Sequence, residues 1–268
     1  MPCVLVKLVM KRMYMNERKI GIIISYLNIL IQAVIGFAYV PILLHYIGKS
    51  EYGLYQLIGS FIAYFSIMDF GLTAAVVRFY SKYKALHDQL RMENILAIAM
   101  RAYVVITALM FVAGIGFYLY LPSIFAKSMT VAEIESAKQL FLLLLFNIVV
   151  AISTMIFRAV INAHEKFLFL KGLETIQLVL QPILVVLVLQ KLPSAMAVAM
   201  VQTVLNVALI SARIYYCFQN LHIKICYHYW DAELFADFKK LALSVFAVTL
   251  IDQVFFKTNQ VILGMNNR

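Results

Sequence analysis

The segment that decides the fold is Ile20–Leu44, with the sequence IGIIISYLNILIQAVIGFAYVPILL, which contains no Asp, Glu, Lys or Arg. A helix needs roughly 20 apolar residues to cross the hydrocarbon layer of a bilayer. Basic residues precede the segment, as in a secretory signal peptide, but its apolar run is too long for one and lacks a small-residue cleavage pattern. The sequence therefore predicts an uncleaved membrane-spanning helix here.

The whole chain shares this apolar character. Of its 268 residues, 64% are hydrophobic and only 13% are charged, and the mean hydropathy is +0.89. This composition is typical of a polytopic membrane protein and excludes a soluble domain. The net charge of +10 does not indicate a nucleic-acid partner, because the Lys and Arg residues lie between apolar runs and not on one polar face.

Seven segments are long and apolar enough to span a membrane, or nearly so. They are Ile20–Leu44, Gly53–Phe79, Ile95–Leu121, Leu140–Ile161, Phe167–Leu189, Ala195–Phe218 and a last one from about Leu241 onwards. Irregular backbone cannot face lipid, and the segments are too long for barrel strands, so all seven are predicted to be helices. The predicted fold class is an all-α polytopic membrane protein with about seven transmembrane helices.

The distribution of basic residues predicts the orientation of these helices. When the ends of the spans are grouped alternately, 17 Lys and Arg residues fall on one side of the membrane and 4 on the other. Because cytoplasmic loops carry the excess of Lys and Arg, we expect the basic side and the N-terminus to face the cytoplasm.

The longest connection on this basic side, residues 219–240, precedes the seventh segment. Trp230, Leu234 and Phe238 recur in it at helical spacing beside charged residues. The pattern predicts an amphipathic helix, which either lies on the membrane surface or packs on the ends of the spans.

Ionisable side chains inside spans are candidates for function, because they are costly to bury and usually face a cavity. Asp69 and Arg78 are nine residues apart in the second segment, on opposite faces of a straight helix, although Gly71 could bend it. Arg78 lies near the cytoplasmic end, where it can also reach the lipid headgroups. For Asp69, a cavity or counter-ion role competes with a role at a helix end.

The fourth and fifth segments carry the strongest indication of a polar cavity. Arg158 shares a face of the fourth segment with Asn147, and Lys171, Glu174 and Gln177 fall within about a 120° arc of the fifth. Hydrogen bonding that only joins the helices is the alternative interpretation.

No catalytic, metal or cofactor site is predicted. The sequence lacks a phosphate-binding glycine loop, an H-E-x-x-H motif and a C-x-x-C motif, and its five histidines are scattered. Cys3, Cys217 and Cys226 are too few and too scattered for a disulfide framework or a metal site. We expect a protein that is not an enzyme. The sequence favours a secondary transporter or a channel-like or scaffold protein, and a membrane-embedded enzyme with lipid substrates is the alternative.

Four stretches resemble the bacterial polysaccharide flippases, which export O-antigen and capsule repeat units and belong to the multidrug/oligosaccharidyl-lipid/polysaccharide exporter superfamily. They are ISYLNILIQAVIGFAYVPILLHYIGKSEYGLYQLIGSF (24–61), MDFGLTAAVVRFY (68–80), FRAVINAHEKFLFLK (157–171) and DQVFFKTNQVILG (252–264). The resemblance implies two facing six-helix bundles joined by a cytoplasmic link, in a chain close to twice as long as this one. We therefore expect an N-terminal fragment of such a protein.

With this resemblance, the chain divides into four predicted parts. They are a cytoplasmic N-terminal segment (1–19), an N-terminal six-helix bundle (20–218), a cytoplasmic amphipathic linker (219–240) and the first helix of a truncated second bundle (241–268).

The activity that the resemblance implies is translocation of undecaprenyl-pyrophosphate-linked oligosaccharide across the bacterial cytoplasmic membrane, for surface polysaccharide synthesis. Membrane lipid, polysaccharide polymerase and glycosyltransferases are the implied partners. A diphosphate that crosses hydrocarbon needs charge-assisted hydrogen bonds in place of water, and the planar fork of arginine fits phosphate well.

Position and polarity then select the candidate site residues. The predicted substrate-binding residues are Arg158 and Arg78, followed by Arg101 and Lys171, and the predicted counter-ions or coupling-ion sites are Asp69 and Glu174. A multidrug-type secondary transporter is one alternative, although the basic excess would repel organic cations. A non-transporting scaffold of a glycan-synthesis complex is the other.

Overall fold

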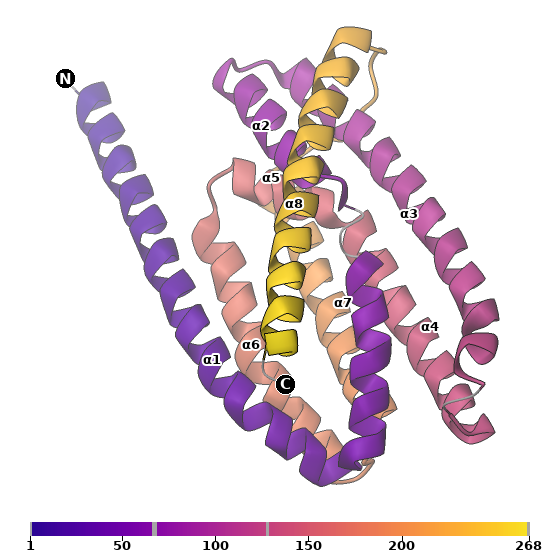
Figure 1. The fold of residues 1–268 in the computed structure, drawn as a ribbon. Helices are drawn as coiled ribbons and strands as arrows, with labels where there is room; N and C mark the ends of the chain where they lie inside the picture. The colour runs from indigo at the N-terminus through magenta and orange to yellow at the C-terminus, as the bar shows by residue number, and fades with distance from the viewer. Residues whose placement is uncertain (1, 66–68, 127–128, 267–268) are drawn as a thin grey trace.

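The computed structural model of the chain describes residues 2–65, 69–126 and 129–266, and the side chains of residues 20–62, 69–126 and 129–251. Every regular element in these ranges is a helix: α1 (Pro2–Phe65), α2 (Leu72–Ala85), α3 (Gln89–Phe125), α4 (Val131–Ser153), α5 (Met155–Ala163), α6 (Phe167–Leu189), α7 (Ala195–Gln219) and α8 (Ala232–Asn266). The helices form an elongated bundle (Figure 1), which confirms the all-α polytopic class.

Five segments of the described chain are long and apolar enough to cross a membrane. They are Ile20–Ile62, Gln89–Phe125, Val131–Ala163, Phe167–Leu189 and Ala195–Gln219. The predicted third, fifth and sixth spans are confirmed as α3, α6 and α7. Ser194 fixes the start of α7, because its hydroxyl accepts a hydrogen bond from the Ala197 N–H at 3.2 Å. The predicted second and seventh spans include residues 66–68 and 267–268, which lie outside the described residues.

Helix α1 contains the predicted first span, a sharp bend and the start of the second span. The bend is at Gly48, where φ is 74° and ψ is 173°. This backbone conformation is essentially restricted to glycine. The two arms of α1 meet at the end of the bundle opposite the N-terminus (Figure 1), so Gly48 makes the predicted short connection between the first two spans.

The second span is not the single helix that the sequence predicted. It is interrupted before α2 begins at Leu72, because Phe70 and Gly71 have positive φ values of 49° and 71°. A Cβ atom on Gly71 would lie 2.5 Å from the Ala242 carbonyl oxygen and 2.8 Å from the Val245 Cβ. Glycine is therefore required both by the turn and by the close approach of α8.

The fourth span is interrupted as well, since α4 ends at Ser153 and α5 begins at Met155. The Thr154 hydroxyl donates to the Val150 carbonyl oxygen at 2.7 Å and also lies 3.1 Å from that of Ala151. Such a side-chain bond satisfies a carbonyl that the break leaves free and often bends a helix. The break reorients α5, which carries Arg158.

The connection between α7 and α8 confirms part of the amphipathic helix predicted over residues 219–240: residues 232–240 are helical, with Leu234 and Phe238 buried, but the preceding residues are not. Residues 221–231 are not helical, and α8 then runs without a break from Ala232 through the predicted seventh span. Asp231 starts this helix, since its carboxylate accepts from the Leu234 N–H at 2.9 Å. The connection is held against α3, because the His228 N–H donates to the buried Asn94 side chain at 3.2 Å.

The strained turn at Gly48 leads to a stability prediction. We expect Gly48→Ala to lower the free energy of unfolding by about 1–3 kcal/mol, because an L-residue is forced into a conformation that only glycine populates readily. Gly53→Ala is the matched control, since Gly53 is helical and no atom lies within 4 Å of the added Cβ. Unfolding in mixed detergent micelles, followed by circular dichroism, should separate the two variants, and equal stabilities would contradict the strained turn.

Candidate functional site

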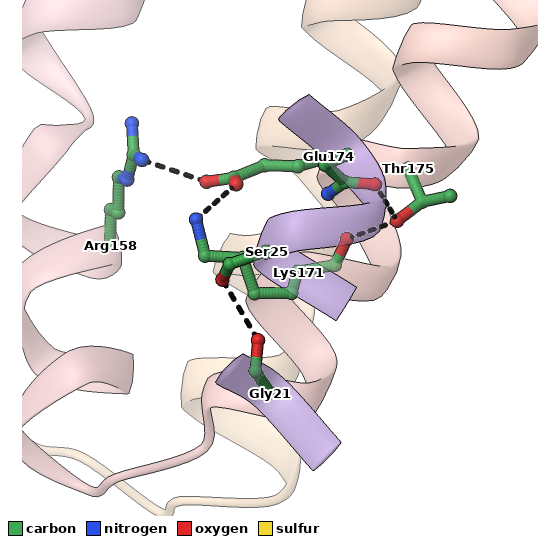
Figure 2. A network of polar contacts seen from close by, with 7 residues as sticks. Gly21, Ser25, Arg158, Lys171, Glu174 and Thr175 are labelled. Carbon is green, nitrogen blue, oxygen red and sulfur yellow. Dashed lines mark hydrogen bonds and ion pairs between the residues drawn. The ribbon is translucent and has the colours of Figure 1, made fainter. Parts of the chain in front are cut away.

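Arg158, Lys171 and Glu174 come together between α5 and α6. The Arg158 Nη2 donates to the Glu174 Oε1 at 2.8 Å, and the Lys171 Nζ donates to the Glu174 Oε2 at 2.7 Å. Figure 2 shows the two cations approaching opposite oxygens of the one carboxylate. Three of the six predicted site residues thus form a single cluster, with Glu174 as the counter-ion of both cations.

The lysine and the glutamate are held in place by contacts between α6 and α1. The Thr175 hydroxyl lies 2.8 Å from the Asn28 Oδ1 and 2.8 Å from the Lys171 carbonyl oxygen (Figure 2). Two turns before Asn28 in α1, Gly21 lies so close to α6 that an added Cβ would be 3.1 Å from the Phe167 Cβ. This close packing fixes the turn of α6 that carries Lys171 and Glu174.

A cavity with a volume of about 190 Å³ adjoins Arg158. Its lining residues are Ala151, Thr154, Met155, Arg158, Gln177, Asn206, Leu209, Ile210 and Arg213. The Nε of Arg213 is buried and has no hydrogen-bond partner among the described side chains. Arg213 and Arg158 both line the cavity, and two guanidinium groups on one wall suit an anion.

Arg213 was not among the predicted site residues, because its position at the end of a span explained it as a marker of topology. The sequence did contain a signal. Arg213 follows Asn206 by seven residues, which places both side chains on the same face of α7.

A chain of amide hydrogen bonds continues from the cavity into the bundle. The Gln177 Nε2 donates to the Asn206 Oδ1 at 2.6 Å, and the Asn206 Nδ2 donates to the Asn147 Oδ1 at 2.8 Å. The Asn147 Nδ2 in turn donates to the Thr203 hydroxyl at 3.2 Å. The predicted polar stripes therefore both join α4, α6 and α7 and supply one wall of the cavity.

Asp69 lies apart from this cluster, at the start of α2. Its Oδ1 accepts from the hydroxyls of Thr73 at 3.0 Å and Tyr103 at 3.1 Å, and its Oδ2 accepts from the Thr73 N–H at 3.4 Å. A carboxylate in this position is favoured by the free N–H groups and the dipole of the helix that follows. Asp69 therefore stabilises the interruption of the second span.

Asp69 and Arg78 both line one pocket of about 620 Å³ between α2, α5 and α8. The spacing had placed them on opposite faces of a straight helix, but the turn at Gly71 allows both to line the same pocket. Within the described part of the chain, no hydrogen bond or ion pair joins the two side chains. Arg78 thus lines a different pocket from Arg158.

Arg101 is separated from the other predicted residues. Its guanidinium carbon lies 3.7 Å from the centre of the Tyr227 ring, which is a cation–π distance. The contact joins α3 to the irregular connection before α8. Among the described residues, no group of three or more His, Cys, Asp or Glu side chains could hold a metal ion.

A histidine cluster joins α2 to the end of α5. The His164 Nδ1 lies 3.1 Å from the Lys84 Nζ, and its Nε2 lies 3.1 Å from the Tyr80 hydroxyl. Because the ammonium can only donate, Nδ1 must accept and the neutral ring keeps its proton on Nε2. Burial, with the charges of Lys84 and Lys166, lowers the pKa of His164 to about 4.

Comparison with known proteins gives one family and one fold. The family model described as polysaccharide biosynthesis protein matches residues 19–266. No curated protein matches the chain in sequence.

Three solved structures have a similar fold. A MATE in complex with MaD3S gives a TM-score of 0.68 at 12% identity, with 88% of this chain and 53% of that chain covered. A MOP superfamily transporter from Pyrococcus furiosus, described by the reverse polarity of its binding pocket, gives a TM-score of 0.61 at 12% identity, with 87% of this chain and 53% of that chain covered. A MATE mutant gives a TM-score of 0.60 at 14% identity, with 87% of this chain and 54% of that chain covered. The chain spans about half the length of these structures.

The His164 cluster predicts a pH dependence of stability. The ring has a pKa of about 4 in the folded chain and an ordinary value of 6.5, so the unfolded chain binds more protons between these pH values. The free energy of unfolding should therefore be unaffected by this group above pH 6.5 and fall as the pH is lowered from 6.5 to 4. Thermal unfolding of the chain and of His164→Gln across this range tests this, and identical slopes would contradict it.

Proposed function

Because the chain belongs to the polysaccharide biosynthesis protein family, as its motifs predicted, we propose that it forms one bundle of a transporter for lipid-linked oligosaccharide. The carrier lipid we propose is undecaprenyl pyrophosphate, and the membrane is the bacterial cytoplasmic membrane, with the N-terminus in the cytoplasm. Glycosyltransferases and a polysaccharide polymerase would act before and after this step.

One observation carries the proposal: Arg158 and Lys171 share a single carboxylate, Glu174, and Arg158 lines a cavity together with Arg213. Arg158, Lys171 and Glu174 lie in apolar segments able to span a membrane, as does Arg213. Three cations and one carboxylate in these apolar segments leave an excess of two positive charges, which an anionic ligand would neutralise. A pyrophosphate supplies that charge, and its oxygens match the guanidinium donors of Arg158 and Arg213.

Glu174 would compete with the ligand for the same donors. In the unliganded chain it takes hydrogen bonds from both Arg158 and Lys171. A phosphate group that enters the cavity would replace some of these bonds, and the resulting balance lets the ligand leave as well as enter. Arg101 and Arg78 lie outside this arrangement, since Arg101 stacks on Tyr227 and Arg78 lines another pocket.

The polarity of the cavity distinguishes this proposal from a multidrug-type transporter. Organic cations would meet Arg158 and Arg213 on the cavity wall, and neither Asp nor Glu lines it. Like charges at this distance disfavour a cationic ligand.

Loss of either guanidinium should weaken binding of the headgroup. We expect Arg158→Gln and Arg213→Gln each to reduce the affinity for undecaprenyl pyrophosphate about tenfold or more, because each removes a charge-assisted hydrogen bond. Binding would be measured by native mass spectrometry of the chain in nanodiscs of zwitterionic lipid. Arg91→Gln is the control, since Arg91 is exposed and contacts Asp88 near the start of α3. Wild-type affinity in both cavity variants would disprove the proposed site.

Removal of the competing carboxylate should have the opposite effect. We expect Glu174→Gln to raise the affinity for undecaprenyl pyrophosphate, because Arg158 and Lys171 are released for the ligand. The same variant should lower the free energy of unfolding of the unliganded chain, since the cations then lie together without a counter-ion. A general folding defect would weaken binding, so an increase in affinity identifies the competition, and an unchanged affinity contradicts it.

A further inference from the structure

A second cationic pocket lies between α2 and α8, at the end of the bundle where the connection enters α8. It has a volume of about 540 Å³ and is lined by Arg78, Lys82, Asp237, Lys240, Leu241 and Ser244, together with Phe79. It shares no lining residue with the Arg158 cavity. This pocket is therefore separate from the Arg158 cavity, and it shares Arg78 with the pocket that Asp69 lines.

The pocket is built by two regular helix faces. Arg78 and Lys82 are four residues apart on α2, and Lys240 and Ser244 are four residues apart on α8. Residues at this spacing are neighbours on one face of a helix. Phe79 packs against Phe238 of α8, with ring centres 6.1 Å apart, so the two faces are held together by buried aromatic side chains.

The charges of this pocket are not balanced among the residues whose side chains are described. Three cations face one carboxylate, Asp237. In the part of the chain whose side chains are described, no ion pair or side-chain hydrogen bond satisfies Arg78, Lys82 or Lys240. The Lys82 Nζ lies 5.7 Å from the centre of the Tyr83 ring.

The position of the pocket indicates the kind of anion that would occupy it. It lies at the end of the bundle predicted to face the cytoplasm, where the apolar part of α8 begins with Leu241. Lipid phosphates are found at this depth, and clustered Lys and Arg residues at the cytoplasmic boundary attract anionic lipids. Leu241 and Phe79 supply an apolar surface beside the cations.

We propose that this pocket binds a phosphate group, which contacts Arg78 and Lys82 from α2 and Lys240 from α8. The phosphate comes from the headgroup of an anionic lipid or from free phosphate, and the chemistry of recognition is the same. Because the ligand contacts both helices, its binding holds α8 against α2. The proposal does not depend on the substrate of the Arg158 cavity.

The test measures the thermal stability of the chain in nanodiscs of phosphatidylcholine alone and with phosphatidylglycerol. A ligand that binds only the folded chain raises its melting temperature. We expect phosphatidylglycerol to raise the melting temperature of the wild type, and Lys82→Gln or Lys240→Gln to weaken this effect so that about tenfold more anionic lipid is needed. In a separate arm, sodium phosphate is compared with sodium chloride at equal ionic strength, and a shift there identifies free phosphate as sufficient.

Lys239→Gln is the matched control for Lys240→Gln. The two lysines are adjacent in α8 and both are exposed, but only Lys240 lines the pocket. Lys239→Gln should respond to the anionic lipid like the wild type. An equal loss of response in Lys239→Gln and Lys240→Gln would show unspecific surface attraction, and no response of the wild type to either anion would also overturn the site. Unchanged melting temperatures in phosphatidylcholine confirm that the variants fold.

Discussion

Hydrogen bonding of the backbone in a medium without water controls this structure. Each interruption of a membrane-spanning helix must satisfy the groups that it frees. The two interior breaks do so with side chains, since Asp69 accepts from the Thr73 N–H and Thr154 donates to the Val150 carbonyl. These breaks position the functional residues as well, because α5 carries Arg158 and the turn before α2 lets Asp69 and Arg78 line one pocket.

The sequence predicted the helices well where apolar length alone determines them. Fifth-span boundaries at Phe167 and Leu189 match α6, since an uninterrupted apolar run has no other stable form in lipid. The sequence indicated that Gly71 could bend the second span, but not that the helix is interrupted there, because hydropathy does not report the sign of φ. The irregular segment before α8 was missed for a different reason. The helical spacing of Leu234 and Phe238 is confirmed by α8, but contacts of His228 with Asn94 and Glu93 of α3 hold the residues before Asp231 in another conformation.

For the candidate site, the sequence predicted which residues share a helix face but not which helix faces meet. Helical periodicity placed Lys171 and Glu174 together on one face, and one face of the preceding span supplied Arg158. Periodicity does not show which faces of different helices meet, so the contact between Arg158 and Glu174 appears only in the fold. Arg213 was not predicted as a site residue, because a basic residue near the end of a span is already explained by the orientation of the chain in the membrane. Arg101 also lies near the basic end of a predicted span, yet its guanidinium stacks on the Tyr227 ring.

The two cationic pockets differ in the partners of their cations. Arg158 and Lys171 share Glu174, although the side chains of the two cations are 42% and 33% exposed. Lys82 and Lys240 are exposed and have no ion-pair partner in the described structure, since an exposed ion pair gains little in water. An anion that enters the proposed inner site must therefore displace a carboxylate, whereas at the proposed outer site no ion pair has to be broken. Exchange with Glu174 would favour release of a ligand from the inner site.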